Sequence, residues 1–339
     1  MREYVGIDLH RRRSVVVCLN AEGERLWWRC IDNSPLALAE VIGEAGSEPE
    51  VVLEATFGWY WAADVIAEAG GRVHLAHPLG VKGFENRRVK NDLRDATLLA
   101  DLLRMGRLPE SWIPPHSVRE LRELVRYRHK LSQLRSGLKS QIHGVLGKEG
   151  VIPELRWLWG PGGFEFLNQV QLGEAYGIRV TSLRDLIEVY DREIKGLDGR
   201  IHRRLRDDPG YRAIQELTGV GRVFAGVFCA EIGDVSRFSA PNKLCCWAGL
   251  TPRLRESDTK TIQGPITKQG SKLVRWAAIE AVARYRGGAP IKDTFWRVAE
   301  RRGVNRAKVA AARKLLTLVF YGLRDGEIRC LAKDREQAA

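Results

Sequence analysis

The chain has 339 residues, of which 44% are hydrophobic, so it can bury a sizeable core and we expect two or three domains. Its 55 Lys and Arg against 42 Asp and Glu give a formal net charge of +13, which favours a polyanionic partner, above all nucleic acid. No apolar run is long enough to span a membrane and no signal-peptide pattern opens the chain, so we expect no membrane partner. Six cysteines without a CxxC pair predict reduced core residues in a cytosol.

The first third of the chain, residues 1–115, has the pattern of a mixed α/β domain. Five apolar runs predict strands: Tyr4–Asp8, Ser14–Leu19, Arg25–Ile31, Val51–Leu53 and Arg72–Ala76. Helical patterns begin after Ser34, cover about 59–69, and begin again near Asp92. Three meander strands followed by alternating helices and strands predict a ribonuclease-H-like sheet with helices on its faces.

Four carboxylates stand at corresponding ends of these elements. The first strand runs into Asp8 and the fourth into Glu54, and we expect these two strands to be neighbours. Asp92 and Asp95 are three residues apart, so they share a face of the helix that begins there. Each alone could be an ordinary strand-end or helix-capping residue. Together they suit two Mg²⁺ ions about 3.5–4 Å apart, an arrangement that promotes phosphoryl displacement.

Residues 116–210 predict helices that pair along an apolar seam. A long basic helix covers about 117–146, and a Gly-, Pro- and Trp-rich connector, 153–177, separates it from a second helix. The second helix carries an apolar stripe at heptad spacing: Leu183, Ile187, Tyr190, Ile194, Leu197, Ile201 and Leu205. The stripe fits either an antiparallel hairpin or an intermolecular coiled coil, and we expect a homo-oligomer, a dimer or tetramer.

The last domain, 211–339, has a mainly helical pattern. Gly219 and Gly221 resemble a helix-hairpin-helix turn, in which backbone N–H groups can approach a phosphate. A long polar stretch, 252–270, predicts an irregular loop, and loops of this length in a compact domain are usually functional. Its Arg253, Arg255 and Lys268 suit a phosphodiester, and its hydroxyls are available as nucleophiles, although composition alone fits an ordinary solvated loop.

These motifs together resemble the DEDD transposases of bacterial insertion sequences, insertion sequence family 110. The similarity covers nearly the whole chain and is carried by the following segments: GIDLH with Asp8, VLEAT with Glu54, KNDLRDA with Asp92 and Asp95, LTGVG, AEIGDVSRF, WAGLTP and GPITKQGSKLVR. The resemblance implies a RuvC-like N-terminal domain, a coiled coil and a C-terminal transposase domain. It also implies that the four carboxylates bind Mg²⁺.

The resemblance further implies that a serine of the C-terminal domain attacks the DNA and forms a covalent phosphoserine link. Ser257 is the matching serine, with Ser271 and Thr259 as alternatives. Family members usually have glycine directly after this serine, whereas this chain has Asp258. The resemblance also implies an RNA guide, encoded by the ends of the element, that pairs with donor and target DNA. We therefore expect a cytoplasmic bacterial recombinase whose active sites combine domains of different protomers.

We expect nucleic-acid contacts from a set of basic and glycine residues: Arg11, Arg12, Arg13, Lys90, Gly219, Gly221, Arg253, Arg255 and Lys268. Three other functions remain open. A RuvC-like nuclease would use metal-activated water in place of serine. An actin- or sugar-kinase-like ATPase also begins with a Gly-Ile-Asp strand but normally continues into Gly-Thr, where this chain has Leu9 and His10. A non-catalytic nucleic-acid scaffold would not need Asp8.

Overall fold

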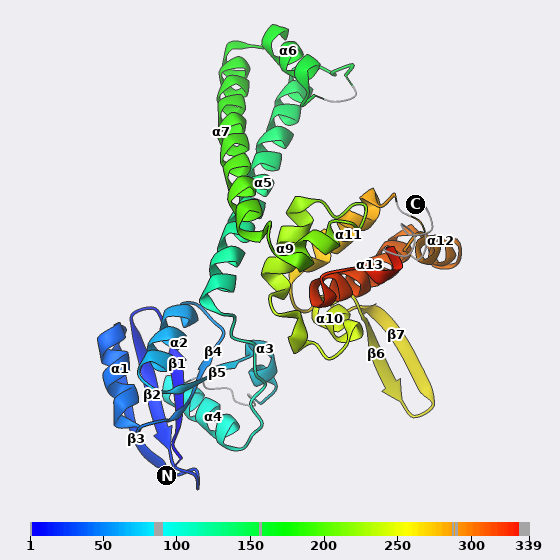
Figure 1. Cartoon of the computed structure of the whole chain (residues 1–339). Coiled ribbons are helices and arrows are strands. Elements are labelled where there is room, and N and C mark those ends of the chain that lie inside the picture. The colour runs from blue at the N-terminus through cyan, green and yellow to red at the C-terminus, as the bar shows by residue number, and fades with distance from the viewer. Residues whose placement is uncertain (1, 85–90, 156–157, 287, 289–290, 332–339) are drawn as a thin grey trace. The chain divides into compact units, whose positions relative to one another are not determined.

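A computed structural model describes residues 2–84, 91–155, 158–286, 288 and 291–331 (Figure 1). The chain divides into two compact units, Met1–Pro114 and Pro115–Ala339. Among the helices of the described residues, none has the length and apolar character needed to cross a membrane.

The first unit is built on a five-stranded mixed sheet with the strand order β3-β2-β1-β4-β5. Its strands are β1 (Tyr4–Leu9), β2 (Arg13–Leu19), β3 (Arg25–Asp32), β4 (Glu50–Glu54) and β5 (Arg72–Ala76). The first three strands form an antiparallel meander, whereas β4 lies parallel to β1 and β5 parallel to β4. The predicted mixed sheet, with the first and fourth strands as neighbours, is therefore confirmed.

Helices cover both faces of this sheet (Figure 1). α1 (Pro35–Glu44) and α2 (Trp59–Glu68) pack on one face, and α4 (Asp92–Arg104) packs on the other; two short turns, α3 (Pro78–Val81) and η1 (Lys82–Phe84), precede α4. Because side chains alternate along a strand, Val5 and Ile7 join the core under α1 and α2, which leaves Gly6 and Asp8 on the α4 face.

Two long helices of the second unit pair side by side as an antiparallel hairpin (Figure 1). They are α5 (His116–Lys148) and α7 (Glu174–Leu205), with α6 (Pro161–Gln169) between them. The heptad stripe of α7 is buried against α5 within the same chain, so the hairpin is the arrangement that this chain adopts. The predicted connector at 153–177 contains α6 and the first turn of α7.

The remainder of the second unit is mainly helical, as predicted. Its elements are α8 (Pro209–Ile214), α9 (Arg222–Ile232), η2 (Val235–Arg237), α10 (Pro241–Trp247), β6 (Pro252–Ser257), β7 (Lys260–Ile266), α11 (Lys272–Arg284), α12 (Ile291–Arg302) and α13 (Val304–Asp325). A large apolar core, with Phe228 and Leu315 fully buried, joins α9, α10, α11 and α13.

The expectation of an irregular loop at 252–270 is wrong. β6 and β7 form an antiparallel hairpin that is exposed on both faces. A strand without a buried face shows no alternation of apolar and polar residues, which is why its sequence does not reveal it. The expected burial of the cysteines is also wrong for Cys30, Cys246 and Cys330, which are exposed.

Candidate active site

A glycine in β1 lets α4 lie directly on the sheet. A Cβ atom at Gly6 would stand 2.0 Å from the carbonyl oxygen of Ala96 and 2.8 Å from the backbone nitrogen of Ala100. Both distances are far below van der Waals contact, so no other residue fits at this position without moving the helix. This close approach brings the first turn of α4 toward the end of β1 that carries Asp8.

The register of β1 and β4 brings two of the predicted carboxylates to the same level. Ile7 pairs with Leu53, so Asp8 and Glu54 are the next residues of two adjacent parallel strands. Val52 packs under α4, and Glu54, two residues later, points to the same face. The sheet therefore brings Asp8 and Glu54 to the α4 side of its carboxyl edge, as the sequence predicts.

Asp8, His10 and Asp92 form a cluster of possible metal ligands. One ligand atom of each lies within 4.8 Å of the others. Nε2 of His10 is 3.2 Å from Oδ2 of Asp8 and 3.6 Å from Oδ2 of Asp92. The Asp8 side chain is 19% exposed and that of Asp92 is 47% exposed, so the cluster opens to solvent on the helix side.

Asp95 lies in the first turn of α4 with Asp92 and is half-buried. Asn91 caps this helix, because its side-chain oxygen accepts a hydrogen bond of 2.9 Å from the backbone N–H of Leu93. The positive end of the helix dipole offsets part of the repulsion between its acidic side chains. Neither Asp95 nor Glu54 belongs to the 4.8 Å cluster found among the described residues, which contains two of the four predicted carboxylates. Glu54 ends the strand next to that of Asp8, and Asp95 lies in the same helical turn as Asp92.

The predicted basic loop follows the carboxylate edge directly. Arg11 and Arg12 are exposed between β1 and β2, and Arg13 is the exposed first residue of β2. Asn33 holds this loop, since its side chain donates a 2.6 Å hydrogen bond to the carbonyl oxygen of His10. Lys90, the other basic residue expected here, lies outside the described residues.

Ser257, the predicted nucleophile, is the last residue of β6 and is exposed. It pairs across the hairpin with Lys260, so these two side chains leave the same face of the hairpin. Arg253 and Arg255 precede Ser257 at two-residue intervals on β6, and all three are exposed. The hairpin thus carries the hydroxyl of Ser257 close to several cations.

The residue after Ser257 has an unusual backbone conformation. Asp258 has φ of +51°, in the left-handed region that glycine prefers. Aspartate is among the few other residues that tolerate this region. The structure therefore gives a physical reason for the glycine that the resembled family usually has at this position, and it shows that Asp258 preserves the turn.

The two alternative nucleophiles differ in their surroundings. Thr259 is exposed in the turn between β6 and β7. Ser271 instead caps α11: its hydroxyl accepts a 3.2 Å hydrogen bond from the N–H of Val274 and donates one of 3.0 Å to Oε2 of Glu231. These two hydrogen bonds give Ser271 a structural task, which makes it the weaker nucleophile candidate.

The predicted glycine turn stands at the start of α9. Gly219 has φ of +92°, and a Cβ there would lie 2.5 Å from the carbonyl oxygen of Ala281 in α11. Gly221 caps α9 without a side-chain hydrogen bond. The turn therefore needs Gly219 for its conformation and its packing. The backbone N–H groups at the start of α9 carry no side-chain cap.

Lys268, also expected to contact nucleic acid, is exposed with φ of +56°.

Sequence reasoning missed His10 as a member of the carboxylate cluster. His10 stands two residues after Asp8, and that spacing was the available signal, because residues i and i+2 of an extended segment point to one face. The sequence places Lys260 in the same basic stretch as Arg253, Arg255 and Lys268, but its position directly opposite Ser257 follows only from the cross-strand register.

Fold and site together define an α/β domain with a carboxylate edge, joined in one chain to a basic helical unit. Comparison with known families finds a matching family model for each of these two parts. The DEDD model of IS110, described as Transposase, matches residues 5–149, and the model described as Transposase IS116/IS110/IS902 family matches residues 211–296. The chain belongs to this transposase family and is a DNA transposase.

Curated relatives carry the same description. The chain is 27% identical over 300 residues to the transposase for insertion sequence element IS1111A of Coxiella burnetii, covering 83% of this chain and 79% of the relative. It is 26% identical over 288 residues to y4qE of Sinorhizobium fredii, which is also named a transposase, covering 84% and 72% respectively. A solved structure, Thermus thermophilus RuvC in complex with a Holliday junction substrate, matches 33% of this chain and all of that chain, with 16% identity and a TM-score of 0.26.

Proposed function

We propose that the chain is a magnesium-dependent recombinase of an insertion sequence, in which Ser257 is the nucleophile and an RNA encoded by the element guides it to donor and target DNA. The observation that carries the proposal is the gathering of Asp8, Glu54 and Asp92 at one edge of the sheet, two of them within 4.8 Å of His10. The net charge of +13 supports a polyanionic substrate.

The donor set fits Mg²⁺. Hard divalent cations take carboxylate oxygens, and Asp8, Glu54, Asp92 and Asp95 supply only such oxygens. When bound, magnesium ions would stabilise the charge on the phosphate that reacts. His10, a nitrogen donor, suits magnesium less well, and we assign it the task of orienting Asp8 and Asp92.

Ser257 would form a bond from its Oγ to phosphorus while the bond from phosphorus to the leaving sugar oxygen breaks. One phosphodiester replaces another, so the energy of the broken link is kept for strand rejoining. Lys260, opposite Ser257 in the hairpin, and Arg255, two residues before it, would neutralise charge on the phosphate.

Ser257 and the acidic edge belong to different compact units. In the proposed reaction both act on the same DNA, and we propose a homo-oligomer in which domains of different copies combine. The resembled family uses such an arrangement together with a guide RNA. We accordingly propose DNA, a guide RNA and further copies of this chain as partners, in the bacterial cytosol or nucleoid.

Two substitutions test the proposal on a labelled donor DNA supplied with guide RNA and Mg²⁺. Asp8→Asn should reduce strand cleavage at least 100-fold, because it removes one charged ligand. Ser257→Ala should remove the covalent protein–DNA adduct detected on a denaturing gel. Matched controls are Asp185→Asn, an exposed aspartate of α7, and Thr259→Ala, which keeps the hydroxyl of Ser257. Both controls should retain activity.

The alternative is a RuvC-like nuclease that uses water as its nucleophile. Ser257→Ala would then cleave DNA as fast as the unaltered chain, with no adduct from either protein. Full activity of Asp8→Asn would exclude both metal-dependent functions.

A further inference from the structure

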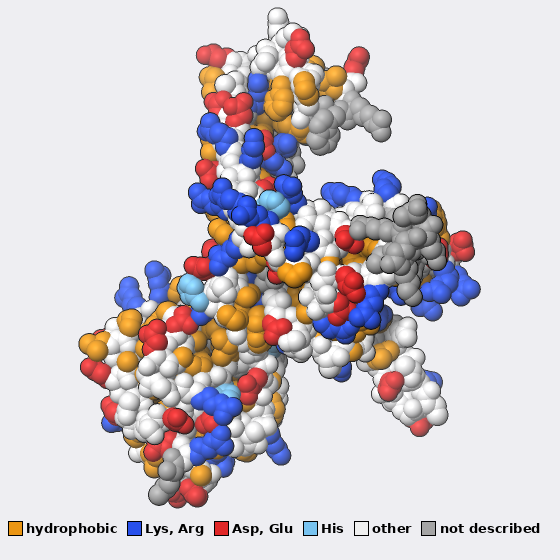
Figure 2. Space-filling view, viewed as in Figure 1, with side chains coloured by type: hydrophobic (Ala, Val, Ile, Leu, Met, Phe, Trp, Pro, Cys, Tyr) orange, Lys and Arg blue, Asp and Glu red, His pale blue; other side chains and the backbone are white. Residues whose placement is uncertain are grey.

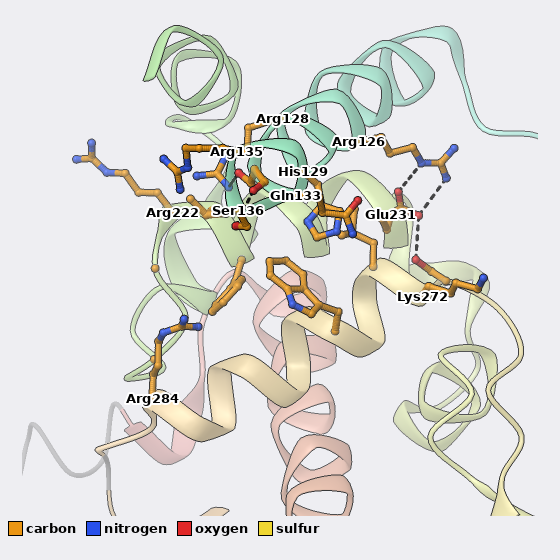
Figure 3. A pocket seen from close by; sticks show the side chains of 18 of the residues that line it. Arg126, Arg128, His129, Gln133, Arg135, Ser136, Arg222, Glu231, Lys272 and Arg284 are labelled. Carbon is orange, nitrogen blue, oxygen red and sulfur yellow. Dashed lines mark hydrogen bonds and ion pairs between the residues drawn. The ribbon is translucent and has the colours of Figure 1, made fainter. Parts of the chain in front are cut away.

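A cavity of about 1520 Å³ lies within the second unit, between α5, the first turn of α9 and the length of α11 (Figure 3). Sites for drug-sized molecules usually measure about 300–1000 Å³. Lys272 and Arg284, the first and last residues of α11, both line the cavity. Thirteen residues of helix extend about 20 Å, so the cavity suits an extended polymer better than a compact small molecule.

The lining of the cavity is strongly basic. Six cationic side chains and one carboxylate, Glu231, line it; the cations are Arg126, Arg128, Arg135, Arg222, Lys272 and Arg284. Three of these cations also form ion pairs outside the lining, Arg128 with Asp198, Arg135 with Asp191 and Arg284 with Glu280, so six cations stand against four carboxylates in all. Glu231 is neutralised, because Arg126 donates hydrogen bonds of 2.7 and 3.1 Å to its two oxygens. A net excess of cations in a concave surface attracts an anionic ligand. Figure 2 shows Lys and Arg gathered over the α5–α7 hairpin of this unit.

α5 presents a polar stripe to the cavity. His129, Ser132, Gln133 and Ser136 all line it, at the i, i+3, i+4 and i+7 spacing that marks one face of a helix. A helix face that packs on protein at this spacing is normally apolar. Hydroxyl, amide and imidazole groups there instead provide hydrogen bonds to a polar ligand.

An aromatic cluster lies beside the cations. His129 lies against Trp276 with ring centroids 4.5 Å apart and ring planes tilted by 56°, and Phe224 meets Trp276 edge to face at 5.4 Å. Nδ1 of His129 is buried and has no hydrogen-bond partner among the described residues. Burial, followed by the charge of Arg128, lowers the pKa of His129, so its ring is neutral near pH 7. Aromatic faces next to cations are the usual platform for unpaired bases.

We propose that this cavity binds single-stranded nucleic acid, with phosphates along the arginines of α5, α9 and α11 and a base against Trp276. The inference rests on the proposed function, because it assumes an enzyme that acts on nucleic acid. It adds the site at which an unpaired segment of that nucleic acid binds. A duplex offers no exposed base face to Trp276, whereas an unpaired strand does.

Binding of fluorescent 20-nucleotide DNA, RNA and duplex DNA by the full chain, without Mg²⁺, tests this inference by fluorescence anisotropy. The variant is Gln133→Glu with Ser136→Glu, two exposed cavity residues whose change adds negative charge without removing packing. The control is Gln169→Glu with Gln171→Glu, an equal charge change at two exposed residues outside the cavity lining. We expect the cavity variant to bind single strands roughly tenfold more weakly, with a shallower salt dependence, and the control less than twofold.

Photocrosslinking gives an independent readout. An oligonucleotide with 5-iodouracil, or 4-thiouracil in RNA, should crosslink to the α11 peptide that contains Trp276 in the unaltered chain. The DNA and RNA arms show which strand the cavity prefers. Four results would each overturn the inference. The first two are equal binding by the cavity and control variants, and crosslinks that form only outside the α11 peptide. The other two are tighter binding of duplex than of single strands, and displacement of the oligonucleotide by polyglutamate as effectively as by unlabelled oligonucleotide. None of these results depends on magnesium or on Asp8, so they leave the test of the recombinase proposal separate.

Discussion

Asp258 has a backbone conformation that most side chains avoid, directly after the proposed nucleophile. Its φ of +51° costs a non-glycine residue roughly 1 kcal/mol relative to glycine. The turn is nevertheless formed, with Ser257 and Lys260 paired across it. A local conformational requirement, and not the chemistry of the aspartate, therefore accounts for the residue types found at this position.

This leads to a prediction for the turn. Asp258→Gly should retain or increase strand-transfer activity, because glycine adopts the left-handed region without strain. Asp258→Val should lower it several-fold, because a β-branched residue resists this region. Adduct yield on the labelled donor DNA measures both effects. Equal activity of the glycine and valine variants would show that the turn conformation does not position Ser257.

Glu50 is a buried carboxylate at the other end of the sheet from Asp8. Burial acts to raise its pKa, but hydrogen bonds from His74, at 2.6 Å, and from Arg2 outweigh this effect and lower it. A carboxylate whose pKa is lowered by folding stabilises the fold above its unfolded pKa. That contribution is lost as the pH falls from the ordinary glutamate range through the lowered value.

Glu50→Gln should therefore destabilise the chain by roughly 1–3 kcal/mol at pH 7, because the hydrogen bonds to a charged acceptor are lost. The difference from the unaltered chain should shrink as the pH is lowered below about 4. Urea denaturation at several pH values measures it, with the exposed Glu48→Gln as control. A difference that stays constant down to acid pH would contradict this account.

At the scale of elements, the contact between β1 and α4 determines whether the carboxylate edge exists. Gly6→Ala would push a methyl group to 2.0 Å from the carbonyl oxygen of Ala96, so helix and strand must separate. We expect a loss of about 1–3 kcal/mol in stability and a larger loss of cleavage, because Asp92 moves with α4.

Thermal unfolding and the cleavage assay together test this prediction. Gly43→Ala is the matched control: Gly43 lies inside α1, and an added Cβ meets no atom within 4 Å. Alanine in a helix interior is about 0.5–1 kcal/mol more favourable than glycine, so this control should be slightly stabilised. If Gly6→Ala is as stable and active as the control, the close packing of α4 is not what brings the acidic residues together.

At the scale of the whole molecule, the hairpin leaves a second apolar surface. The heptad stripe of α7 is used within the chain, yet Ile178, Leu186 and Val189 of the same helix are 66%, 45% and 43% exposed. Exposed apolar residues that share one helix often mark a contact with another chain. We propose this surface as the contact that forms the homo-oligomer.

Leu186→Glu combined with Val189→Glu should accordingly reduce the oligomer to a smaller species without unfolding it, as measured by light scattering after size exclusion. Leu36→Glu on α1, where Leu36 is 70% exposed, is the control and should not change the mass. An unchanged mass for the α7 variant would assign oligomer formation to another surface.

The sequence alone determines the order of elements and the edge at which acidic residues gather. Strand and helix periodicities are local patterns of a few residues. They are enough to predict that β1 and β4 are neighbours, that Asp8 and Glu54 lie at the same end of the sheet, and that a helix begins at Asp92. The resemblance to the family adds the expectation that Ser257 is the nucleophile, which no periodicity reveals.

Only the tertiary structure shows which elements pack against each other. The stripe of α7 fits a partner helix in the same chain or in another, and its burial against α5 settles that choice for the described chain. The hairpin at Ser257, the contact of His10 with Asp8 and Asp92, and the basic cavity along α11 all join residues that are distant in sequence or lack a local pattern. Long-range contacts depend on packing of the whole unit, and the local sequence carries little information about them.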